Sequence, residues 1–193
     1  MCGVENRTTF TQLREHAVMS TAYHEAGHMV AAYVLGLPLL DGGIHIDLEL
    51  SGVAYYCHRL PGDLSNSPQD EVERENTVIA LYSGRIAQVR FFPDYDDPAS
   101  WESDEAIANQ LLKESEYDSP RASEQRLRLQ AESLVESYWG FIEGLASALL
   151  AKPITAMPQH ELEKGWSKGT RKQEKCMSHS EVSDFFQRKG VGQ

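Results

Sequence analysis

Apolar residues recur at helical spacing along most of the chain, and this pattern predicts a mainly α-helical protein. The first helical pattern covers residues 12–35. It stops at Gly36, with Pro38 just beyond it, which is a common way for a helix to end. Residues 1–11 are polar, and we expect them to form a flexible N-terminus.

The segment after this helix has a period of two instead. Apolar and polar residues alternate from Ile44 to Leu50, which predicts a half-buried strand over 44–50. Ser51 and Gly52 suit a tight turn, and a returning strand is expected over 53–60. The two segments together predict a β-hairpin.

The rest of the chain returns to helical spacing. Ser67 before Pro68 and Ser119 before Pro120 are typical of a capped helix start. Further helices are predicted over 68–92, 104–116, 120–151 (with a break at Gly140) and 157–166, with a loop over 93–103.

The expected fold class is therefore mainly α with a small antiparallel β-hairpin or sheet. We expect one domain over 12–166, because a chain of 193 residues is long enough to bury one core. Residues 167–193 are mostly polar and are expected to form a partly flexible C-terminal tail.

Composition narrows the classes of partner. The net charge of −11 argues against a nucleic-acid partner, since phosphate binding depends on Lys and Arg. Three widely spaced cysteines predict no disulfide framework. The first residues lack the apolar core of a secretory signal, and the nearly apolar stretch 29–40 is too short to span a bilayer. We expect a soluble, cytoplasmic protein with no membrane span.

The first predicted helix contains the sequence HEAGH, which fits the HExxH pattern of zinc peptidases. His24 and His28 lie four residues apart, so both imidazoles project from one helix face and can bind one Zn²⁺. Glu25 is placed to act as general base on a zinc-bound water. An incidental pair of histidines is the alternative, but two imidazoles in an apolar segment are costly to bury without partners.

A hydrolytic zinc needs a third protein ligand, and the candidate residues differ in how well they are placed to bind the metal. Ala31 and Val34 stand where the metzincin pattern needs Gly and His, which excludes that class. Glu49 falls in a strand and is poorly placed. Asp104 lies on the inward face of a later helix, although an acid in a first helical turn also complements the helix dipole. The residues alone leave both interpretations of Asp104 open.

Four segments resemble, in the same order, the peptidase domain of the FtsH-type membrane proteases, which are linked to an AAA ATPase. The resemblance covers roughly residues 12–165. The matching segments are STAYHEAGHMVAAYVLG (20–36), GGIHIDLELSGVAYY (42–56), IALYSGRIAQ (79–88) and SDEAIANQL (103–111).

This resemblance implies a helical, zincin-like peptidase domain with Asp104 as the third Zn²⁺ ligand, and a homo-oligomer, a hexamer in that family. The chain departs from the family pattern at Gln88, where the family often has Glu. The loop 94–103 and the residues after 167 also have no counterpart.

We therefore expect a zinc-dependent endopeptidase that hydrolyses unfolded or extended proteins. No GxxxxGK[ST] motif occurs, so a separate ATPase partner could supply substrate. Two other hypotheses stay open: a non-catalytic zinc-binding interaction module, and a repressor-cleaving protease of the HEIGH type. The strand 44–50 could receive a peptide along its edge, or its outward residues could form an ordinary solvated face.

Overall fold

A computed structural model describes residues 5–47, 51–65, 67–93, 100–116, 119–156 and 173–190, with side chains from residue 15 onward. The helices are α1 (Glu5–Val34), α2 (Pro68–Phe91), α3 (Glu102–Glu114), α4 (Pro120–Ser137), α5 (Trp139–Leu150) and α7 (His179–Lys189). The strands are β1 (Leu39–Asp47), β2 (Gly52–Tyr56), β3 (Thr155–Ala156) and β4 (Gln173–Met177). The fold class is thus mainly α with a small antiparallel sheet, as predicted.

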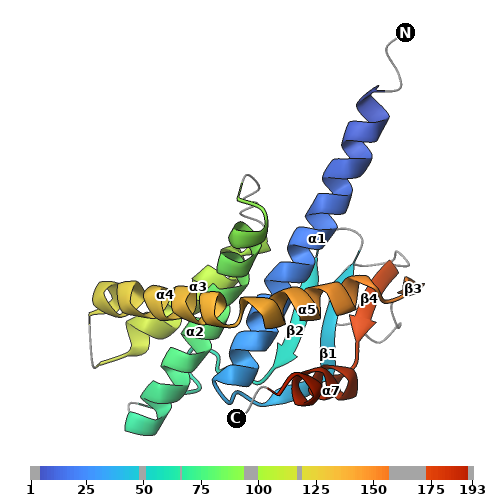
Figure 1. Ribbon diagram of the computed structural model, residues 1–193. Coiled ribbons are helices and arrows are strands. Elements are labelled where there is room, and N and C mark those ends of the chain that lie inside the picture. Colours follow the sequence, from blue (N-terminus) through green and yellow to red (C-terminus); the bar gives the residue numbers. More distant parts are fainter. Residues whose placement is uncertain are drawn as a thin grey trace.

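Helix α1 is the longest described helix, and the other elements pack around its C-terminal half (Figure 1). It begins at Glu5, earlier than the predicted start at residue 12. The first residues are polar, but no Gly or Pro interrupts the chain between Val4 and Ala26. Because adding one residue to an existing helix costs little, the helix continues upstream.

Several predicted helix boundaries are confirmed. The side chains of Ser67 and Ser119 cap α2 and α4, each followed by proline. The break predicted at Gly140 lies two residues earlier, at Tyr138 between α4 and α5. The helix predicted over 157–166 lies outside the described residues.

The sheet differs from the predicted hairpin because a distant segment joins it. The strand order is β2-β1-β4-β3, with antiparallel pairing throughout. Strand β1 therefore has a neighbour on both sides, so the idea that it receives a peptide along its edge is wrong. Strand β2 is the edge strand of the described sheet on the side of the hairpin. Residues 48–50, including Glu49, lie outside the description.

The predicted C-terminal tail also differs. Residues 173–177 form β4 in the interior of the sheet, and α7 follows directly. Val182, Phe185 and Phe186 of α7 are buried in the main hydrophobic core. Burial of these three apolar side chains stabilises the folded segment, although most of its other residues are polar.

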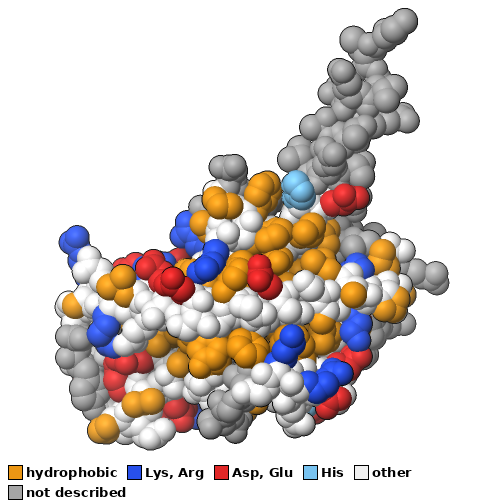
Figure 2. Space-filling model, viewed as in Figure 1, with side chains coloured by type: hydrophobic (Ala, Val, Ile, Leu, Met, Phe, Trp, Pro, Cys, Tyr) orange, Lys and Arg blue, Asp and Glu red, His pale blue; other side chains and the backbone are white. Residues whose placement is uncertain are grey.

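Helix α1 presents two different faces to its neighbours. Ala22, Ala26 and Met29 are fully buried in the core that α5 closes. His24 and His28 project from the other side, because residues two apart on a helix point about 200° away from each other. Figure 2 shows hydrophobic side chains gathered beside α5, with charged side chains scattered around them.

Helices α1 and α2 approach each other closely. Gly27 lies against the backbone of Ser83 and Gly84 and against Ala87. The small side chains of both helices permit this close approach. None of the helices in the described part of the chain is long and apolar enough to cross a membrane.

Candidate metal centre

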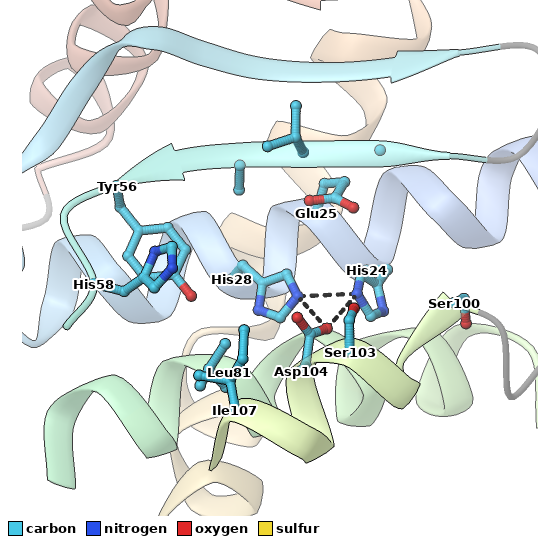
Figure 3. Close-up of a pocket in the computed structure, with 13 residues that line it drawn as sticks. His24, Glu25, His28, Tyr56, His58, Leu81, Ser100, Ser103, Asp104 and Ile107 are labelled. Atoms are coloured by element: carbon cyan, nitrogen blue, oxygen red, sulfur yellow. Dashed lines mark hydrogen bonds and ion pairs between the residues drawn. The ribbon is translucent and has the colours of Figure 1, made fainter. Parts of the chain in front are cut away.

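The three residues predicted to bind a metal lie together in one cavity. Figure 3 shows His24 and His28 of α1 facing Asp104 of α3. The two Nε2 atoms lie 2.9 Å apart, and each lies 3.2 Å from Oδ2 of Asp104. Ligands of one tetrahedral zinc ion with bonds near 2.0 Å lie about 3.3 Å apart, so this triangle has the size of a zinc site.

Hydrogen bonds at the far side of each imidazole fix which nitrogen carries the proton. Nδ1 of His24 lies 3.0 Å from Oε1 of Gln88, and Nδ1 of His28 lies 2.8 Å from the carbonyl oxygen of Ala80. Both partners are acceptors, so each Nδ1 donates its proton. The Nε2 lone pairs then point at one shared place, which a cation or a proton must occupy. The donor set therefore fits a divalent metal.

The charges of the site are strongly coupled. Burial favours the neutral form of each group, but the mutual attraction of imidazole and carboxylate outweighs it. The pKa of Asp104 falls below its ordinary range because of both histidines, and the pKa of His28 rises to about 9 because of Asp104 and Glu25. In the absence of a metal, a proton is therefore held between the imidazoles and the carboxylate, and a bound metal ion would displace it.

Glu25 faces the same cavity from α1, with 6 % of its surface exposed. Burial raises the pKa of this carboxyl group, although both histidines and the backbone N–H of Ala54 act in the opposite direction. A Cβ atom on Gly52 would lie 2.5 Å from Oε1 of Glu25, so β2 passes directly over the carboxylate. The geometry suits a group that takes up and releases a proton.

Two arginines hold the first turn of α3, which carries Asp104. Arg128 of α4 donates two hydrogen bonds to Glu105, at 3.0 Å and 2.6 Å. Cζ of Arg85 on α2 lies 3.8 Å from the ring centroid of Trp101. Nη1 of the same arginine lies 3.6 Å from Oε1 of Glu105. Ion pairs and cation–π contacts on two sides keep this turn in place beside α1.

The inward face predicted for α3 is confirmed. Ala108 and Leu111 are buried in a second hydrophobic cluster, and Ile107 lines the cavity of His24 and His28 one turn after Asp104. Because residues three, four and seven apart share a helix face, packing of the apolar side chains turns Asp104 toward the histidines.

Sequence reasoning did not assign a role to several residues of the cavity. Gln88, which departs from the family pattern, is the acceptor for His24, and the hydroxyl of Ser100 donates to the same Oε1 at 3.0 Å. Tyr56 and His58 also line the cavity. The alternation of β2 puts Tyr56 on the cavity side, but only the three-dimensional arrangement shows it.

No model of a known protein family matches this chain, and neither does any of the curated proteins with which it was compared.

Proposed function

We propose that this protein is a zinc-dependent endopeptidase that acts on unfolded or extended protein chains. One observation carries the proposal: His24, His28 and Asp104 converge at the spacing of zinc ligands, with the carboxylate of Glu25 in the same cavity. The resemblance to FtsH-type peptidases in four ordered segments points to the same chemistry.

The edge strand β2 gives a place for the substrate. Gly52, Val53 and Ala54 line the metal cavity, so a peptide that pairs with β2 would pass over the histidines. Pairing with an exposed strand edge binds extended chains of many sequences, because main-chain hydrogen bonds supply the affinity. A cavity of about 170 Å³ suits an extended segment better than a helix, which is about 10 Å wide.

The protein's own groups then handle the proton. A zinc ion at this site would polarise the scissile carbonyl and lower the pKa of the attacking water. Glu25 accepts the proton of that water and passes it to the leaving amine. Burial raises the pKa of Glu25, which makes it a stronger base for the first of these two steps.

Folded substrates do not fit this arrangement. We propose that a separate ATPase or a homo-oligomer of this chain, a hexamer by resemblance, presents unfolded segments to the cavity, in the cytoplasm.

Cleavage of unfolded casein by the purified, zinc-loaded protein tests the proposal. Chelation should remove the activity and added Zn²⁺ should restore it. Asp104→Asn should lower zinc occupancy and abolish cleavage, whereas Glu102→Gln, an exposed acid of the same helical turn, should change neither. Full zinc occupancy with no cleavage of casein or of peptide libraries would favour the non-catalytic zinc-binding module instead.

A further inference from the structure

A second group of potential metal ligands lies on the sheet, away from the cavity of His24 and His28. It consists of His45 on β1 and of Glu174 and Cys176 on β4. In the register of the two strands, His45 lies opposite Cys176, and Glu174 lies two residues from Cys176. Because side chains alternate between the two faces of a sheet, all three project from one face. Ile44 and Ile46 project from the other face, into the core.

A hydrogen bond from one ring nitrogen of His45 leaves the other nitrogen to face a ligand, as at the first site but with the two nitrogens exchanged. Its Nε2 donates to the carbonyl oxygen of Gly42 at 2.7 Å, which leaves Nδ1 to face Oε2 of Glu174 at 3.0 Å. The side chain of Glu174 is 2 % exposed. A buried carboxylate facing an imidazole lone pair needs a positive charge between them.

We propose that His45, Glu174 and Cys176 form a second zinc site, with ligand atoms Nδ1, Oε2 and Sγ. These three atoms lie within 4.8 Å of one another. Zinc bonds of about 2.0 Å to nitrogen and oxygen and about 2.3 Å to sulfur place ligands about 3.3–3.6 Å apart, so small rotations of the side chains would close the site. Nitrogen, oxygen and thiolate ligands together favour zinc over magnesium or calcium.

The site would be structural in its effect. It joins two strands whose ligands His45 and Glu174 lie 129 residues apart. Strand β4 leads directly into α7, whose apolar side chains complete the core. A zinc ion there would fix the C-terminal segment to the hairpin and offset the cost of closing so long a loop. This inference does not depend on the proposed peptidase function.

The alternative is a proton in place of the metal, which would make His45 and Glu174 a simple ion pair. Cobalt substitution distinguishes the two, because Co²⁺ bound to a thiolate shows a sulfur-to-metal charge-transfer band. The first site contains no sulfur, so such a band in the wild-type protein requires a cysteine ligand. We expect the band, together with two bound metal ions per chain.

Matched variants assign the band. Cys176→Ser should remove it, whereas Cys57→Ser, a change at another half-buried cysteine, should keep it. His28→Ala should lose one of the two ions and retain the band, which separates this site from the peptidase site. If Cys176→Ser does not fold, the band should persist in both Cys57→Ser and Cys2→Ser, which leaves Cys176 as the ligand because the chain has three cysteines. Absence of the band in wild-type protein, or its loss with Cys57→Ser, would overturn the proposal.

Discussion

Replacing Gly84 by alanine should weaken metal binding by His24 and His28, although no ligand residue is changed. Gly84 lies on α2 beneath the ring of His28, and a Cβ atom there would lie 2.4 Å from both Cε1 and Nε2 of that ring. Ordinary contacts begin at 3.4 Å, so the ring would have to move by 3.4 − 2.4, or about 1.0 Å. Metal–ligand bonds tolerate about 0.2 Å.

The displacement also acts on the second nitrogen of the ring. Nδ1 of His28 donates to Ala80, one turn before Gly84 on the same helix, so pushing the ring away from α2 breaks this bond. Loss of such a supporting bond alone lowers metal affinity about 10- to 100-fold. With the ligand itself displaced, we expect zinc affinity to fall at least about 100-fold, or about 2.7 kcal/mol. Overpacking should cost a further 1–3 kcal/mol, roughly, in stability.

Competition titration with a zinc chelator measures the affinity, and thermal unfolding of the chelated protein measures the stability. Gly140→Ala is the matched control, because nothing lies within 4 Å of a Cβ atom built at this helical position. It should leave zinc affinity unchanged and raise stability by up to about 1 kcal/mol. Wild-type zinc affinity in Gly84→Ala would refute the geometry of the site.

Three further results are expected. Gln88→Leu removes the acceptor for His24, so zinc affinity should fall about 10- to 100-fold in the same titration. In the chelated protein, burial lowers the pKa of His28 but the site carboxylates raise it to about 9, above its ordinary 6.5. Its stabilising charge is therefore fully present below pH 6.5 and lost as the pH rises through about 9, so urea denaturation should show a smaller free energy of unfolding above pH 9. Arg128→Ala removes the partly exposed pair with Glu105, and thermal unfolding should show a loss of about 1 kcal/mol, with weaker zinc binding because α3 is less firmly held.

Sequence patterns predict those features of the molecule that depend on neighbouring residues alone. The spacing of His24 and His28 places both on one helix face, and the apolar residues after Asp104 turn this carboxylate inward. Both inferences need only the period of a helix. The caps at Ser67 and Ser119 are equally local.

Pairing between distant segments could not be predicted in the same way. The sequence of 44–50 is compatible with an edge strand, because nothing in this segment reveals its pairing with β4, which lies at residues 173–177. The role of Gln88 has the same origin, since it depends on α2 packing against α1.

Helix α7 did carry a signal that a polar composition obscured. Ser178 and Glu181 form a capping box, and Val182, Phe185 and Phe186 follow at helical spacing. A start signal followed by an apolar face predicts a packed helix even in a polar segment. The average polarity of residues 167–193 concealed this face.

Cleavage of unfolded casein by wild-type protein and by Glu25→Gln, each at the same measured zinc content, tests the central claim most directly. The substitution keeps the shape of the side chain and replaces the carboxylate that accepts the proton by a neutral amide. We predict full zinc occupancy in both proteins and a loss of about 10²- to 10⁴-fold in the cleavage rate of the variant. Equal cleavage rates for the two zinc-loaded proteins would contradict it.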